Sequence, residues 1–147
     1  MATAGGVLHD SSGAWIGGFA LQIGICSAPL AELWGVYYGL VMAWEKQATR
    51  LELEIDSKVV VGFLKTGVSE AHLLSFLICL CHGFISRDWC VRISHVYRET
   101  NRLADGLANY AFSLELVFHA LDVVSSCIEF LLSSDTQGMA SLRRVCL

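Results

Sequence analysis

The stretch LELEIDSK, residues 51–58, decides the fold because it joins a strand to a helix through a single carboxylate. Leucine and isoleucine alternate with glutamate in its first five residues, and this period of two predicts a β-strand with one buried face. Asp56 follows at the carboxyl end of that strand. Ser57 is a typical N-cap residue and predicts a short helix over Lys58–Lys65. The stretch therefore predicts a strand-to-helix junction with an acid at the turn.

Two apolar stretches upstream of this junction predict a β-hairpin. They are Gly5–His9 and Ala14–Ile23, and the sequence DSSG at 10–13 between them is a strong turn signal. Pro29 then suits the start of a long helix, whose apolar positions recur at helical spacing over Ala31–Ala48. One face of this helix carries the small residues Gly35, Gly39 and Ala43. We therefore expect that face to lie close against a sheet.

Three further elements complete the predicted order. Helical patterns cover Glu70–Ser86 and Thr100–Ser113, and an alternating pattern at Trp89–Val96 predicts a strand between them. The order β-β-α-β-α-α-β-α predicts an α/β fold, a mixed β-sheet flanked by helices. The pattern loosens after Ser113, so we expect one domain over residues 1–135 and a flexible tail over 136–147.

The composition excludes several classes of protein. The 147 residues are 54% apolar and 16% charged, whereas soluble domains are about 25% charged, so a disordered chain is excluded. The net charge of −4 argues against a strongly basic nucleic-acid binder but leaves room for a local basic groove. The most apolar stretches, Leu73–Ile85 and Ala111–Leu132, are too short or too charged to span a membrane. No secretory signal opens the chain. We therefore expect a soluble intracellular protein, nuclear or cytoplasmic, whose six cysteines are buried free thiols.

Three acids stand on separate predicted elements. Glu32 is expected in the first turn of the long helix, Asp56 ends a strand, and Asp105 lies in the last predicted helix. Carboxylates that converge from separate elements suit Mg²⁺, which prefers oxygen ligands. Each acid also has an ordinary structural interpretation. Glu32 would complement a helix dipole, Asp56 would begin a turn, and Asp105 would be a solvated helix residue.

Several motifs in this order resemble the ribonuclease H-like superfamily. They are AGGVLHD at 4–10, GGFA at 17–20, AEL at 31–33, LEIDSKVV at 53–60 and HVYRETNRLADGLA at 95–108. The chain is most similar to the ribonuclease H-type domains of plants, including those attached to non-LTR retrotransposon reverse transcriptases. The resemblance covers roughly residues 4–135. Each motif is weak alone, and their order and spacing make the set specific.

The resemblance implies a Mg²⁺-dependent endonuclease that cuts the RNA strand of an RNA–DNA hybrid, using two metal ions. It assigns Glu32, Asp56 and Asp105 as metal-ligating catalytic carboxylates. His95 matches a mobile histidine that assists proton transfer or product release, although a lone histidine at a strand end is also a common structural side chain. Asn101 matches a residue that helps to arrange the site. The hybrid would be recognised by its minor-groove shape and 2′-hydroxyls.

The chain departs from the family pattern at its start. The family has a central first strand that carries a fourth acid and pairs antiparallel with the second strand and parallel with the strand at 51–55. No such strand precedes the predicted hairpin here, and Asp10 is no substitute because it lies in the turn. A truncated sequence, a degenerate domain or a strand donated by another chain would each explain the gap. We expect truncation, with impaired activity and self-association through unpaired strand edges.

Charge is the second departure. Residues 57–94 offer only Lys58, Lys65, Arg87 and Arg92, which predicts weak, salt-sensitive binding of the hybrid. The alternative function is a non-catalytic nucleic-acid-binding or protein-interaction remnant of a retroelement domain. A 3′-5′ exonuclease of the same superfold is a third candidate, but it requires a different arrangement of acids.

Overall fold

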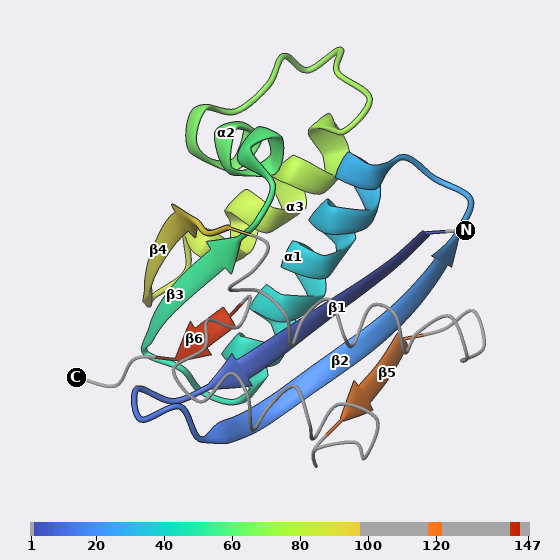
Figure 1. Ribbon diagram of the computed structural model, residues 1–147. Coiled ribbons are helices and arrows are strands. Elements are labelled where there is room, and N and C mark those ends of the chain that lie inside the picture. The colour runs from blue at the N-terminus through green and yellow to red at the C-terminus, as the bar shows by residue number, and fades with distance from the viewer. Residues whose placement is uncertain (1, 98–117, 122–141, 145–147) are drawn as a thin grey trace.

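The computed structural model describes residues 2–97, 118–121 and 142–144 (Figure 1). In chain order the elements are β1 (Ala2–His9), β2 (Trp15–Gly24), α1 (Ala28–Glu45), β3 (Arg50–Ile55), α2 (Lys58–Thr66), α3 (Ser75–Ile85), β4 (Cys90–His95), β5 (Phe118–Leu121) and β6 (Leu142–Arg144). The predicted order of elements is confirmed through β4. The helix predicted over Thr100–Ser113 lies outside the described residues.

The hairpin of β1 and β2 is closed by the side chain of Asp10. Its carboxylate accepts hydrogen bonds from the backbone N–H groups of Ser12 (2.9 Å) and Ala14 (2.9 Å) and from the Ser12 hydroxyl (2.6 Å). These bonds, the Ser12 hydroxyl first among them, lower the pKa of Asp10 below its usual value. Gly13 completes the turn at φ 87°, a left-handed conformation that favours glycine. Asp10 is therefore a turn residue, as predicted.

The sheet has six strands in the order β4-β3-β6-β1-β2-β5. β1 and β2 are antiparallel, and β3 and β4 are parallel. The short β6 lies between β1 and β3, parallel to β1 and antiparallel to β3. It therefore occupies the position that the resemblance gives to the family's first strand, but in the reverse direction. These three residues fall in the range expected to be a tail, and the domain bounds stay a prediction.

Helix α1 packs closely on β1 through its small residues. A Cβ placed on Gly35 would lie 3.3 Å from the Ala4 Cβ, so this glycine permits the close approach that was predicted. The helix begins at Ala28, after the N-cap Ser27, whose hydroxyl accepts a hydrogen bond from the Leu30 N–H at 3.4 Å. Because it begins there, Glu32 lies in the second turn, and its expected place in the first turn was wrong.

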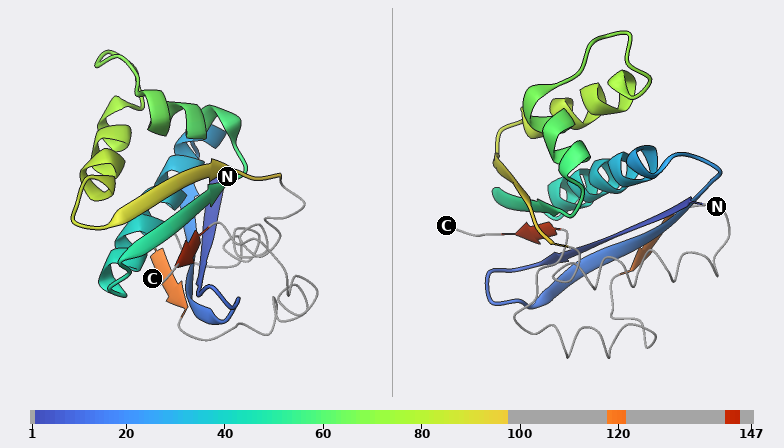
Figure 2. Two further views of the ribbon diagram at one scale, coloured as in Figure 1. Left: turned by 90° about the vertical axis from the view of Figure 1, so that its left-hand side faces the viewer. Right: turned by 45° about the horizontal axis from the view of Figure 1, so that its top comes forward.

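The other two helices complete one layer on the same side of the sheet (Figure 2). In α2, Ser57 is the N-cap, as predicted, and the helix ends at Thr66, before Gly67 at φ 76°. In contrast, α3 begins at Ser75 instead of Glu70, because residues 69–75 form turns in which the His72 N–H donates to the Ser69 carbonyl (3.0 Å) and the Ser75 N–H to the His72 carbonyl (3.1 Å).

The hydrophobic core lies between this helical layer and the sheet. Its fully buried members come from strands and helices alike: Leu8, Phe19, Leu33, Leu40, Leu51, Leu53, Val60 and Cys81. Cys81 is fully buried, which confirms the expectation of a buried thiol there, and this burial raises the pKa of the thiol to about 12. The expectation was wrong for Cys79 and Cys90, which are exposed because they lie on outward-facing positions of α3 and β4. In the described ranges, no helix is long and apolar enough to cross a membrane.

Candidate active site

Asp56 and His95 lie at neighbouring strand ends. β3 and β4 run parallel with Ile55 opposite His95, and the Val96 N–H donates to the Ile55 carbonyl at 2.9 Å. This bond continues the pairing one residue beyond the strands, so the backbone at Asp56, just after β3, lies beside the carboxyl end of β4. Both side chains are partly buried. Ligands gather outside the carboxyl ends of strands in open α/β sheets, and these two residues meet that condition.

Glu32 lies at the same end of the sheet. Gly35, one helical turn after Glu32, faces Ala4 near the start of β1. Because residues three apart share a helix face, Glu32 lies on the same side of α1 as Gly35. β1 runs opposite to β3, because β6 is parallel to the first and antiparallel to the second. The start of β1 and the carboxyl end of β3 are therefore at one end of the sheet. Glu32 is half-buried on the sheet side of α1, at the end that holds Asp56.

A further carboxylate, Glu54, is buried beside this end. It lies two residues before Asp56 and is only 4% exposed, although the alternation of its strand placed it on the polar face. The alternation is correct, since Leu53 and Ile55 belong to the core below the helices. Sequence reasoning missed the burial because it assumed that the other face of the sheet meets solvent. No local sequence signal distinguishes Glu54 from the half-buried Glu52 on the same face of the strand.

Asn101 and Asp105 lie outside the described residues, so the structure does not test their predicted place beside Asp56. Within residues 2–97, 118–121 and 142–144, no group of three or more histidine, cysteine, aspartate or glutamate residues is arranged to hold a metal ion. The described part therefore contributes two carboxylates, Glu32 and Asp56, to one end of the sheet. Both make interactions within the molecule. The assigned roles of all five residues stay predictions.

The helix that follows Asp56 shapes the electrostatics of this end. Ser57 caps α2, its hydroxyl accepting a hydrogen bond from the Val60 N–H at 3.3 Å. The positive end of the α2 dipole therefore lies next to the Asp56 carboxylate and favours negative charge there. Beyond His95, the Tyr97 ring stands edge-on to the imidazole with centroids 5.6 Å apart, and Tyr97 is 71% exposed. This end of the sheet therefore combines a helix N-terminus after Asp56 with an exposed aromatic ring beside His95.

Comparison with known families decides the relationship. Residues 1–111 match the family described as reverse transcriptase-like. The chain belongs to this family. It is 66% identical over 145 residues to an Arabidopsis thaliana protein named as a candidate ribonuclease H protein, and it spans 23% of that relative's length. The match covers 99% of the present chain.

Solved structures support the same relationship at the level of the fold. The ribonuclease H1 of the archaeon Halobacterium salinarum is similar with a TM-score of 0.70 and 26% identity, over 76% of this chain and 85% of that one. The N-terminal ribonuclease H domain of a Mycobacterium tuberculosis protein, solved as a fusion with maltose-binding protein, has a TM-score of 0.60 and 23% identity, over 76% and 91% of the two chains. The predicted ribonuclease H-like fold is confirmed.

Proposed function

We propose that this ribonuclease H-like domain binds RNA–DNA hybrids and hydrolyses phosphodiester bonds of the RNA strand. The observation that supports the proposal is that Glu32, in α1, and Asp56, just after β3, lie toward the same end of a ribonuclease H-like sheet. The similarity to a plant relative and the reverse transcriptase-like family support a retroelement origin in a plant.

Magnesium is the cofactor that this chemistry calls for. Glu32, Asp56 and Asp105 would hold it, since carboxylate oxygens are the ligands that Mg²⁺ prefers. When bound as a pair of ions, it would activate a water and stabilise the leaving oxygen. Among the described residues, Glu32 and Asp56 would supply two of these ligands from one end of the sheet. The third, Asp105, lies outside the described residues.

The remaining residues would handle protons and geometry. His95 stands at the end of β4 and, as the family resemblance implies, would assist proton transfer or the release of the product. Asn101 would orient the neighbouring carboxylates through its amide. Recognition of the hybrid would rest on its minor-groove shape and 2′-hydroxyls, without base sequence.

We further propose that the chain is a poor catalyst. The family resemblance gives the central strand a carboxylate, whereas among the described residues the position between β1 and β3 is held by Leu142–Arg144, which contains no acid. A metal site that lacks one ligand binds its ion more weakly, typically by about 10- to 100-fold when even a supporting group is lost. Slow cleavage at high Mg²⁺ is the expected behaviour.

Cleavage of a fluorescent RNA–DNA hybrid under single-turnover conditions tests the proposal. The chain should cut the RNA strand slowly with Mg²⁺, and Asp56→Asn should abolish the cut. Glu45→Gln is the matched control, because Glu45 is an exposed acid at the far end of α1 and should leave the rate unchanged. Equal rates for Asp56→Asn and Glu45→Gln would refute the assignment of Asp56.

The second candidate function is binding without catalysis, either of nucleic acid or of another protein. The observation in its favour is β6, which fills the central position with residues that cannot ligate a cation. A chain that binds the hybrid tightly in fluorescence anisotropy and leaves it intact with Mg²⁺ and Mn²⁺ fits this function.

A further inference from the structure

Helix α3 carries an apolar face that points away from the core, to which its other side contributes together with α1 and α2. This face, which we call the α3 outer face, comprises Leu73 just before the helix and Phe76, Cys79, Leu80 and Gly83 within it. Leu73 is 97% exposed and Phe76 is 72% exposed. Cys79 and Gly83 are exposed as well, and Leu80 is half-buried. Apolar residues therefore line the solvent side of this helix.

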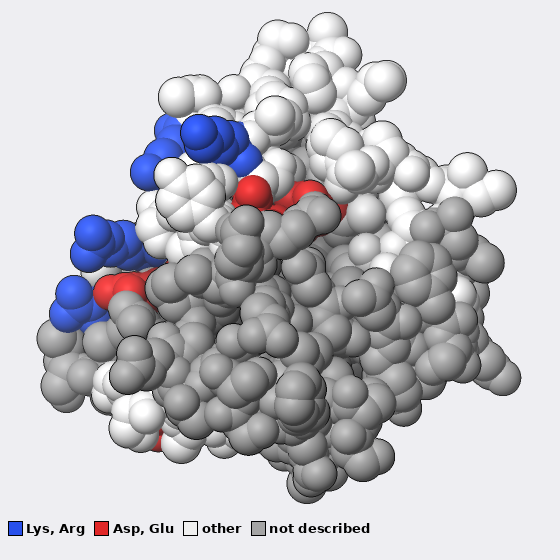
Figure 3. Space-filling view, in the orientation of Figure 1, with Lys and Arg blue, Asp and Glu red and all other residues white. Residues whose placement is uncertain are grey.

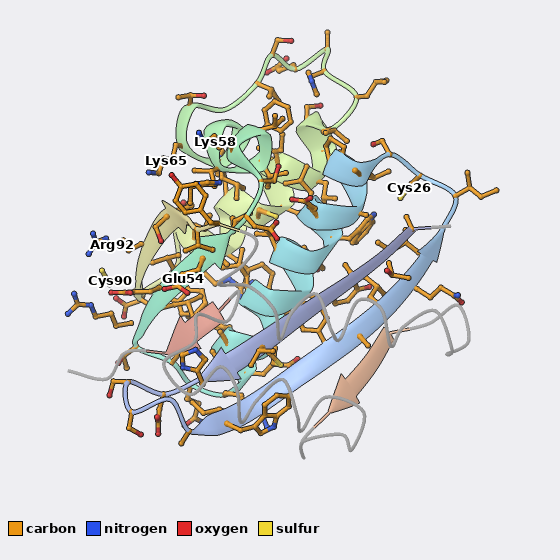
Figure 4. The ribbon with its side chains drawn as sticks, in the orientation of Figure 1. Cys26, Glu54, Lys58, Lys65, Cys90 and Arg92 are labelled. Atoms are coloured by element: carbon orange, nitrogen blue, oxygen red, sulfur yellow. The ribbon has the colours of Figure 1, made fainter. Side chains whose placement is uncertain are left out.

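The α3 outer face is also uncharged. Residues 71–86 contain no acidic or basic residue apart from histidine. A surface helix of a soluble domain normally carries charged side chains on its solvent side, as α2 does with Lys58 and Lys65. Figure 3 shows Lys and Arg atoms at the left of the molecule and no charged residue around the start of α3, and Figure 4 places Lys58, Lys65 and Arg92 on that left side. An exposed apolar surface without charges indicates an interaction site.

The shape of the α3 outer face complements itself. Phe76 stands out from one half of the face, whereas Gly83 leaves the other half open, because a Cβ on this glycine would meet nothing within 4 Å. The two residues are two helical turns apart, about 10 Å along the helix axis. When two such helices pack antiparallel about a two-fold axis between positions 79 and 80, Phe76 of each copy lies opposite Gly83 of the other. The same axis places Cys79 beside Cys79, and Leu80 beside Leu80, of the second copy.

We infer that the α3 outer face binds a second copy of this chain, with the two α3 helices antiparallel. A charged partner such as a nucleic acid or an acidic peptide would find no group for an ion pair on this face. Two copies that each carry a net charge of −4 repel each other, and an uncharged face lets them approach at the lowest electrostatic cost. The 11 residues of α3 span about 16 Å, so the face is smaller than the roughly 800 Å² per partner of a standard stable interface. The dimer is therefore weak and depends on protein concentration.

Crosslinking at Cys79 tests the inference, because the antiparallel arrangement places the two Cys79 thiols side by side. We would treat the parent chain with a short bismaleimide over a range of protein concentrations and map the crosslinked peptides. Cys79→Ser should abolish the crosslinked dimer, and Cys90→Ser should leave it unchanged. Cys90 is the matched control because it is also an exposed cysteine but lies in β4, the terminal strand of the sheet (Figure 4). Crosslinks that join Cys90 residues and not Cys79 residues would overturn the inference, in favour of pairing through the β4 edge.

Sedimentation velocity supplies a second measurement that does not depend on the cysteines. Phe76→Glu should raise the dissociation constant of the dimer by about 100-fold, because losing one aromatic anchor costs about tenfold or more and the two-fold symmetry removes two. Ile25→Glu is the matched control, since Ile25 is 96% exposed before α1 and its substitution adds the same charge. Circular dichroism confirms that each variant folds. Equal dissociation constants for the two variants would overturn the inference, and so would a parent chain that stays monomeric but binds vesicles of neutral phospholipid, in favour of a lipid surface.

Discussion

The contact between Gly6 and Phe19 tests the sheet that positions the site. These residues are paired across β1 and β2, and a Cβ built on Gly6 would lie 2.2 Å from Cε1 and 2.6 Å from Cζ of the Phe19 ring. Phe19 is fully buried, so the ring has no open space to enter. Gly6→Ala therefore overpacks the core, which costs about 1–3 kcal/mol in the free energy of unfolding. In a domain of this size, that lowers Tm by about 3 to 9 °C.

Urea unfolding followed by circular dichroism measures this cost. Gly83→Ala is the control, because a Cβ on this α3 glycine meets nothing within 4 Å, and it should stabilise the helix by about 0.5–1 kcal/mol. Phe19→Leu should relieve the clash. The double variant Gly6→Ala/Phe19→Leu should therefore lose less free energy of unfolding than the sum of the losses in the two single variants. Additive effects, or a Gly6→Ala chain as stable as the parent, would refute the register of β1 and β2.

Three further outcomes follow from the described residues. The pKa of Asp10 is lowered in the folded chain, so the hydrogen bonds of its carboxylate stabilise the fold above the ordinary pKa of about 3.8, and this stabilisation is lost as the pH falls through the lower folded value. Thermal melts at different pH values should show a smaller loss of stability on the acid side for Asp10→Asn than for the parent chain. An unchanged profile would contradict the role of Asp10 in the turn. Peptide-level mapping of thiol labelling at pH 8 should find Cys79 and Cys90 modified in the folded chain and Cys81 only after unfolding, whereas equal labelling would contradict the core. Sedimentation velocity should show self-association through β4 and β5, the terminal strands of the described sheet, and a stable monomer at high concentration would argue against it.

The sequence predicted well where the physical causes are local. The strand and helix on either side of Asp56 follow from the alternation of five residues, the hydroxyl of Ser57 and the left-handed backbone at Gly67, all within a short segment. The hairpin follows in the same way from the Asp10 turn. The close approach of α1 also follows from sequence, since Gly35 leaves room for Ala4.

Features that depend on distant parts of the chain were not predictable. β5 and β6 are short and pair with β2, β1 and β3 across long sequence separations, and no alternation marks them. The start of α3 depends on turns around His72 that compete with the helix. Of the candidate site, the shared end of Asp56 and His95 follows from parallel strands, whereas the burial of Glu54 required the packed structure.

A titration of Mn²⁺ into the ¹⁵N-labelled chain, followed by the broadening of amide signals, tests most directly whether Glu32 and Asp56 form one metal site. We expect selective broadening at Glu32, Asp56 and the carboxyl end of β4, reversed by competition with Mg²⁺. Asp56→Asn should weaken binding by about tenfold or more, with Glu45→Gln unchanged. Broadening spread evenly over exposed acids, or equal affinity in Asp56→Asn and the parent chain, would contradict the account.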